Sequence, residues 1–147
     1  MEIQERLDRA LDEAIAHLHA HSGTIHLKLP GQLVLQLRAS RAIPDPVLAV
    51  VATVPWGKGM AGLAAERAQP VDACNIQTTA SGDVRPGARA TGVAGAIVVP
   101  IMSGAAVVGT LGIGSLEERT FTGTETRWLL DHARALAREL EGGKAEF

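Results

Sequence analysis

Three glycines near the middle of the chain have the spacing that cradles nucleotide phosphates in many proteins. Gly57, Gly59 and Gly62 form the pattern G-x-G-x-x-G, in which backbone N–H groups can approach a pyrophosphate at a helix N-terminus. That fingerprint requires a parallel strand directly before the glycines, whereas a short helix and Pro55 precede them here. We therefore interpret the glycines as structural, since they let the chain turn and the next helix approach the sheet.

Histidine and cysteine side chains could bind a metal ion or act as a redox thiol. His17 and His21 have the i, i+4 spacing that lets two imidazoles share a metal ion on a helix, but no carboxylate is placed to complete the ligand set. Cys74 is the only cysteine, so an internal disulfide is excluded. Because no basic residue adjoins Cys74 to activate its thiol, we expect a buried structural cysteine and no metal site.

Composition restricts the classes of function. The chain has 147 residues, a typical length for one domain, which we place over residues 1–147. A net charge of −2 offers no positive field for a nucleic acid. No apolar run is long enough to cross a membrane, and the N-terminus does not have the pattern of a signal peptide. We predict a soluble cytoplasmic protein without nucleic-acid or membrane partners.

Apolar periodicity predicts the first elements. Residues 1–21 read as an amphipathic helix, because apolar residues recur at intervals of three and four. Alternation with a period of two then predicts a hairpin that turns at Pro30-Gly31. In the hairpin, Thr24, His26 and Lys28 are expected on the polar face. One apolar set is expected to face inward: Ile25, Leu27, Leu29, Leu33, Leu35, Leu37 and Ala39.

The rest of residues 22–121 alternates short elements with one long loop. Asp45 is the predicted N-cap of a short helix that ends near Val51, and a second short helix covers residues 60–68. A short strand follows at 71–73, and residues 74–92 have no sustained period, which predicts a long and often functional loop. Two apolar runs at 94–101 and 106–116 predict a second hairpin.

The C-terminal element is a predicted helix over residues 122–142. Thr122 and Glu125 have the spacing of a capping box at its start, and Gly142-Gly143 ends the apolar seam. Strands that are joined mainly by hairpins form an antiparallel sheet, so the whole order of elements predicts an α+β fold.

Three segments resemble GAF domains: VPWGKGMAGLAAERAQPV, IVVPIMSGAAVVGTLGIGS and RTFTGTETRWLLDHARALARELE. They occur in the expected order and span most of the chain. The resemblance implies a GAF/PAS-like central antiparallel sheet with the N- and C-terminal helices packed on one face. On the other face it implies short helices and a long loop over a ligand pocket.

Some GAF proteins of this size are free methionine-R-sulfoxide reductases, which use a nucleophilic cysteine. Matching GAIVVPI to the reductase segment places that cysteine at about Arg89 and a substrate-binding glutamate at Ala96. Gly112 and Gly114 stand where the reductases have two further acidic residues. Because these groups are missing, the resemblance implies a protein that is not an enzyme; a divergent reductase is the remote alternative.

The same comparison suggests a regulatory small-molecule site, with an unknown ligand or cofactor. A pocket that has lost its acids and is widened by Gly112 and Gly114 favours an anion or a neutral ring. The candidate ligand-binding residues are Trp56, Met60, Thr78, Asp83, Arg85, Arg89 and Thr91. The alternative is that Trp56 and Met60 fill the core, and that Arg85 and Arg89 belong to a solvated loop.

The terminal helices provide a second hypothesis, homodimerisation. Helices in these positions commonly pair across a two-fold axis in GAF domains, so we predict sensing and homodimerisation in signal transduction. The alternative is a dimerisation or protein-interaction scaffold without a ligand. The candidate interface residues are Ile3, Leu7, Leu11, Leu129, Leu136 and Leu140. The alternative explanation of the apolar seam on each helix is that these residues pack onto their own sheet.

Overall fold

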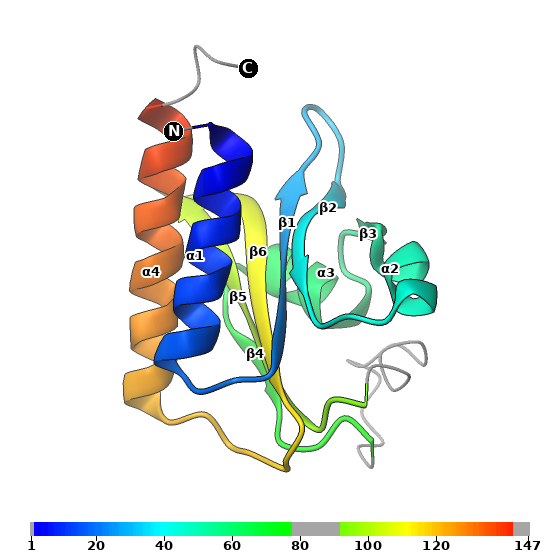
Figure 1. The fold of residues 1–147 in the computed structure, drawn as a ribbon. Helices are drawn as coiled ribbons and strands as arrows, with labels where there is room; N and C mark the ends of the chain where they lie inside the picture. Colours follow the sequence, from blue (N-terminus) through cyan, green and yellow to red (C-terminus); the bar gives the residue numbers. More distant parts are fainter. Residues whose placement is uncertain (1, 78–91, 143–147) are drawn as a thin grey trace.

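The computed structural model describes residues 2–77 and 92–142 (Figure 1). Its helices and strands follow the predicted order, with one additional strand. The helices are α1 (Ile3–His17), α2 (Asp45–Val51), α3 (Gly59–Arg67) and α4 (Gly123–Gly142). The strands are β1 (Ser22–Lys28), β2 (Val34–Arg41), β3 (Thr53–Pro55), β4 (Val71–Ala73), β5 (Gly95–Ser103) and β6 (Ala106–Ser115).

The strands form one antiparallel sheet between two layers of helices. Its strand order is β3-β2-β1-β6-β5-β4, and every neighbouring pair is antiparallel. The long helices α1 and α4 lie side by side on one face, and the short helices α2 and α3 lie on the opposite side (Figure 1). This is the α+β arrangement predicted from the order of elements.

The main core lies between the sheet and the two long helices. Leucines at helical spacing on α1 and α4 pack against aliphatic side chains of β1, β5 and β6. Where the helices meet, the Trp128 ring stacks between His17 and His132, with centroid distances of 3.9 and 4.6 Å. Nε2 of His132 also donates a hydrogen bond to the carbonyl oxygen of Ala10 at 2.8 Å. Apolar and ring contacts thus join the first and last helices.

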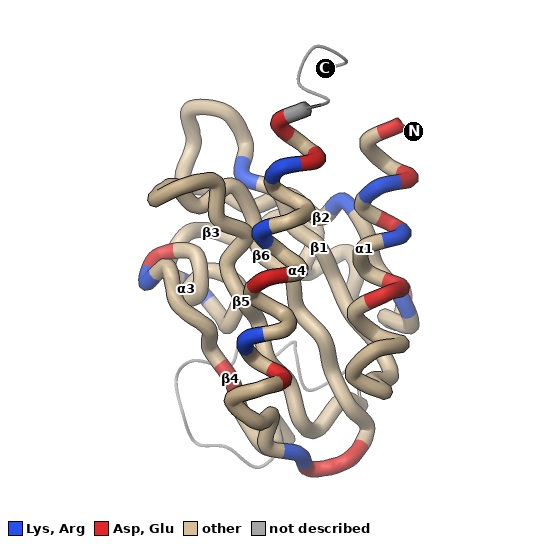
Figure 2. The backbone as a smooth tube through the Cα atoms, turned by 90° about the vertical axis from the view of Figure 1, so that its left-hand side faces the viewer, with Lys and Arg blue, Asp and Glu red and all other residues tan. Residues whose placement is uncertain are grey.

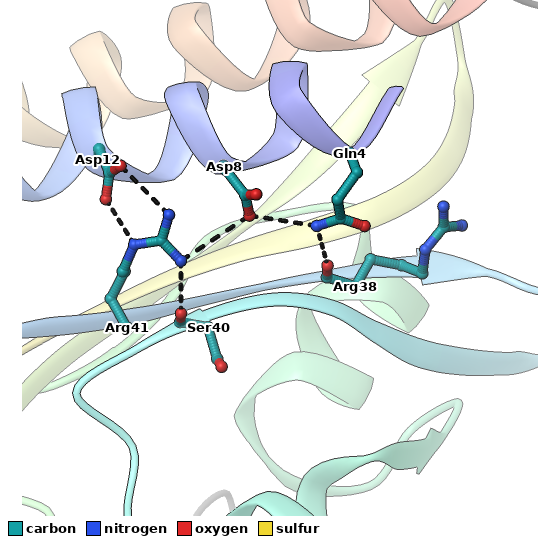
Figure 3. Close-up of polar contacts among 6 residues, drawn as sticks. All are labelled: Gln4, Asp8, Asp12, Arg38, Ser40 and Arg41. Carbon is teal, nitrogen blue, oxygen red and sulfur yellow. Dashed lines mark hydrogen bonds and ion pairs between the residues drawn. The ribbon is translucent and has the colours of Figure 1, made fainter. Parts of the chain in front are cut away.

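Polar side chains hold α1 across β2 (Figure 3). The Arg41 guanidinium lies 2.7 Å from Asp12 Oδ1 and 3.8 Å from Asp8 Oδ1. Gln4 Nε2 donates to the Arg38 carbonyl oxygen at 2.7 Å. These groups are solvent-exposed, and exposed ion pairs contribute about 0–1 kcal/mol each. They orient the helix, whereas the apolar core supplies most of its stability.

The predicted capping box at the start of α4 is confirmed. The Thr122 N–H donates to Glu125 Oε1 at 2.9 Å, and the Glu125 N–H donates to Thr122 Oγ1 at 3.1 Å. The Thr122 N–H, together with the Arg119 guanidinium 2.6 Å away, lowers the pKa of the Glu125 carboxyl. Two orphan helix donors are satisfied in this way.

The predicted face of the first hairpin is partly wrong because β2 contains a bulge. The register shifts between Ile25 and His26, where Arg38 is the extra residue. Before the shift, Ala39 packs in the core under the long helices; after it, Leu35 packs on the opposite face against α3. Leu33 precedes the strand and is 62% exposed. Because the extra residue reverses the alternation of side chains, the apolar residues of the hairpin do not all face the same side of the sheet.

Three boundaries also differ from the prediction. The first helix ends at His17, not at residue 21. Asp45 is the first residue of α2 and Pro44 takes the N-cap position, with no side-chain cap. The strand β3 was not predicted, because its three residues are too few for a period and its pairing with β2 defines it.

Candidate functional site

A cavity lies between the sheet and the short helices α2 and α3. Its volume is about 160 Å³, close to the roughly 150 Å³ that holds benzene in an engineered protein core. Strands β1, β5 and β6 form the floor, and α2 and α3 form part of the wall. Most of the lining is aliphatic, including Val47, Val51, Val54, Met60, Val98 and Ile113. Such a lining suits a compact apolar molecule.

His26 is a buried polar residue of this lining, although alternation in the sequence predicts it on an open polar face. It is 3% exposed, because α2 and α3 cover the sheet face that we expected to be polar and open. Nε2 lies 2.8 Å from the Val51 carbonyl oxygen, whereas Nδ1 has no hydrogen-bond partner in the described part of the chain. Burial lowers the pKa of His26, and the bond to Val51 only partly opposes that effect.

The buried imidazole is expected to make the domain less stable in mild acid. The ordinary pKa is 6.5 and the folded-state pKa is lower, so below pH 6.5 the unfolded chain binds this proton more readily than the folded chain. The free energy of unfolding should therefore fall as the pH drops from 6.5 through the folded pKa.

Urea titrations of the native chain and of His26→Gln at several pH values would measure this contribution. The glutamine amide keeps a donor for Val51 but does not titrate. As the pH falls, the free energy of unfolding of the native chain should decrease relative to that of His26→Gln. Parallel pH profiles for the two proteins would contradict the expectation.

Four of the residues singled out in the sequence meet at the cavity. Met60, a candidate ligand-binding residue, lines it and also packs against the buried cluster of Ile76, Val93 and Ala96. Ala96, Gly112 and Gly114 also line it, and the two glycines stand on the floor provided by β6. The positions at which the resemblance places reductase acids therefore converge on this one cavity.

Trp56, another candidate ligand-binding residue, is not among the residues that line the cavity. It packs with Leu35, Val54 and Ala65 in a separate apolar cluster under α3. Its alternative role, filling the core, is the observed one. The other five candidates lie outside the described residues: Thr78, Asp83, Arg85, Arg89 and Thr91.

The glycine triplet serves the close packing of α3 on β3. A Cβ atom on Gly62 would lie 2.4 Å from the Pro55 carbonyl oxygen, and the Gly57 N–H donates to the Gly62 carbonyl oxygen at 2.9 Å. The triplet does follow a strand, but β3 is an antiparallel edge strand. A dinucleotide fingerprint needs a parallel one.

The predictions for the possible metal and thiol residues need one correction. Cys74 is exposed rather than buried, because the chain leaves the sheet directly after β4. His21 lies beyond the end of α1, so it does not share a helix face with His17. Over residues 2–77 and 92–142, no three His, Cys, Asp or Glu side chains are grouped as metal ligands would be.

Five of the six predicted interface residues lie inside the protomer. Leu7, Leu11 and Leu129 are fully buried, and Leu136 and Leu140 are 2% and 8% exposed. Ile3 is partly buried against the same core. These side chains pack on their own sheet and offer little surface to a partner. The outer sides of α1 and α4 carry charges of both signs instead (Figure 2).

A second hollow of about 480 Å³ lies on the other face of the sheet, between the first hairpin and the end of α4. Leu27 and Val108 lie in it beside charged or exposed residues such as Gln36 and Glu141. It has the larger volume, but charged side chains border it, whereas the mostly aliphatic lining under α2 and α3 is better suited to a compact apolar ligand.

A sheet between two layers of helices, with a cavity under the short ones, is the arrangement that a resemblance to GAF domains implies. A family model described as GAF domain matches residues 1–141. The chain belongs to the GAF domain family. No curated protein matches it, and no helix among its described residues is long and apolar enough to span a membrane.

Solved structures with the same fold include GAF domains of larger proteins and a free methionine-R-sulfoxide reductase. The GAF domain of a phosphoenolpyruvate-protein phosphotransferase from Coxiella burnetii is 20% identical, with a TM-score of 0.82, and the match covers 99% of this chain and 86% of that one. The second GAF domain of DevS from Mycobacterium smegmatis is 16% identical, with a TM-score of 0.75, and the match covers 99% of this chain and 97% of that one. A free methionine-R-sulfoxide reductase from Neisseria meningitidis, in complex with its substrate, is 18% identical, with a TM-score of 0.82, and the match covers 99% of this chain and 82% of that one.

Proposed function

We propose that this GAF domain is a non-catalytic regulatory module of signal transduction that binds a small molecule and forms a homodimer. The observation that carries the proposal is the aliphatic cavity under α2 and α3, whose size suits a compact ligand. Its structural neighbours include a domain described as part of a two-component sensor histidine kinase protein from Sinorhizobium meliloti, which supports a regulatory role by analogy of fold. The ligand in this proposal has no part in covalent chemistry.

The cavity floor supports the absence of catalysis. Ala96, Gly112 and Gly114 line it, where the resemblance to the reductases calls for carboxylates that hold the substrate ammonium. Methyl and hydrogen substituents cannot pair with a cation. Cys74 is the chain's one cysteine, so a second thiol that would resolve a sulfenic acid is missing.

Thermal unfolding in the presence of a panel of metabolites is expected to reveal a stabilising ligand. A molecule at one hundred times its Kd should add about 2.7 kcal/mol to the free energy of unfolding, because it binds only the folded state. Met60→Glu, which places a carboxylate in the apolar lining, should abolish that shift. No shift for any compound would count against sensing.

A turnover assay separates the enzyme alternative from the regulatory one. Free methionine sulfoxide and a dithiol reductant should give no product above the rate measured without protein. Turnover that is lost in Cys74→Ser would establish the divergent reductase instead.

A further inference from the structure

The hydrogen bond at Nε2 determines the tautomer of His26. A carbonyl oxygen can only accept, so the nitrogen 2.8 Å from the Val51 oxygen carries the proton. In the neutral ring, Nδ1 then presents a lone pair. That lone pair has no donor within the described part of the protein, although the side chain is only 3% exposed. A buried acceptor left unpaired is unfavourable, and a bound molecule that donates to it removes that cost.

Thr110 adds a second unpaired polar atom beside the first. It lies directly opposite His26 in the pairing of β1 with β6, so both side chains leave the same face of the sheet. Its hydroxyl is buried and lacks a partner among the residues that the structure describes. Both groups lie on the sheet face that α2 and α3 cover, and His26 is the one of the two that lines the cavity.

The rest of the cavity restricts the ligand's size and charge. Its volume of about 160 Å³ accommodates a single six-membered ring. Val47, Met60 and Val98 supply apolar contacts. Among the described lining residues, Lys58 is the one charged side chain, and it is solvent-exposed. Among these described residues, a buried ligand charge would therefore find no buried counter-charge.

We propose that the cavity binds a compact, uncharged ring that carries one O–H or N–H donor, and that Nδ1 of His26 accepts the hydrogen bond. This rests on the proposed function, because it names the ligand class of the same cavity. The donor gives specificity and the aliphatic wall gives affinity. A ring of the same size without a donor leaves Nδ1 unpaired and binds more weakly.

Phenol and toluene test this preference, since the two rings differ in one hydroxyl against one methyl group. Their dissociation constants would be measured by titration calorimetry and by NMR with the histidine ring nitrogens labelled with ¹⁵N. Phenol should bind about tenfold more tightly than toluene, the order expected for one buried hydrogen bond. Phenol should also shift the Nδ1 resonance of His26, whereas toluene should not shift it in the same way.

His26→Phe should reduce the ratio of the two dissociation constants to about one, because the new ring has no acceptor. His132→Phe is the matched control: it makes the same change on the opposite face of the sheet, where His132 donates to Ala10, and the tenfold ratio should persist. If His26→Phe does not fold, the Nδ1 resonance of the native protein decides.

The outcomes distinguish this inference from the function on which it rests. Equal binding of phenol and toluene, or a preference that persists in His26→Phe, would overturn the role of His26 and leave the cavity as a ligand site. An unmoved Nδ1 resonance at saturating phenol would overturn it too. Binding of neither ring would overturn the ligand class inferred here, whereas the proposed function is overturned only if no compound of the metabolite panel binds.

Discussion

Replacement of Leu7 by glutamate is expected to leave no folded population. The Leu7 side chain is fully buried in the core that joins α1 and α4 to the sheet. Loss of a buried leucine costs about 2–5 kcal/mol, and an unpaired carboxylate in its place adds several more. The sum is comparable to the total stability of about 5–15 kcal/mol that is typical of a domain. Far-UV circular dichroism and the dispersion of amide NMR signals would show the loss.

Leu7→Ala provides the graded version of the same experiment. It should keep the fold and lower the free energy of unfolding by about 2–5 kcal/mol, read from a urea titration. A folded Leu7→Glu protein with half the native mass would contradict the expectation, because it would place Leu7 in an interface between chains.

Homodimerisation is therefore better tested on the outer side of the helices. Ala135 is exposed on α4, so Ala135→Arg adds bulk and charge without entering the core. Under our proposal, sedimentation should give a dimer for the native chain and a smaller mass for this variant. Ala105→Arg makes the same change in the turn between β5 and β6 and should leave the mass unchanged. A monomeric native chain would remove the dimer from the proposed function.

Replacement of Gly62 by alanine is the second change with a large expected effect. The added methyl group would lie 2.4 Å from the Pro55 carbonyl oxygen and 3.1 Å from the Gly57 nitrogen, both backbone atoms. Since no side chain can swing away, α3 must move from β3. Overpacking of this kind typically costs about 1–3 kcal/mol, and we expect the upper end.

Gly123→Ala is the matched control for that substitution. Gly123 begins α4, and a Cβ atom there meets nothing within 4 Å. This variant should be neutral or more stable by up to about 1 kcal/mol. Urea titrations of both variants provide the comparison. Equal stabilities would show that the tight approach at Gly62 is unimportant.

The Gly62→Ala variant also connects the glycine triplet to the cavity. Met60 and Ala61 belong to α3 and line the cavity, so displacement of the helix should weaken ligand binding as well as the fold. The glycine pattern then matters to ligand binding through helix placement.

The long helices and the hairpins could be predicted because their signals are local. In α4, Thr122 and Glu125 identify the first turn by their own hydrogen bonds, and the leucine spacing identifies the buried side. By contrast, β3 exists through its pairing with Val34, Leu35 and Gln36 of β2. A contact between distant segments leaves no period in three residues.

The site was harder to predict because the sheet is covered on both faces. Alternation in β1 places His26 opposite Ile25, which indicates a polar face only if that face is open to solvent. The unbroken apolar run of β5 was the available signal, since both faces of that strand are buried. Strands β5 and β1 flank β6 in one sheet. If both faces of β5 are covered, the same layer of helices is expected to cover His26 in β1.

The bulge in β2 shows a second kind of limit. Alternating residues continue through Arg38 without interruption in the sequence, yet the register shift sends Ala39 and Leu37 to different faces. Only the pairing with β1 reveals the extra residue. The five candidate residues between 78 and 91 stay predictions, since they lie outside the described chain.

The two aromatic indoles of the chain are Trp56 and Trp128, and they lie in different layers. Trp56 contacts the small cluster under α3, and Trp128 is sandwiched by imidazole rings where α1 meets α4. The fluorescence of each tryptophan therefore reports on one side of the sheet. Trp128→Phe would leave an emission that follows the α3 layer alone, and Trp56→Phe would leave one that follows the paired long helices.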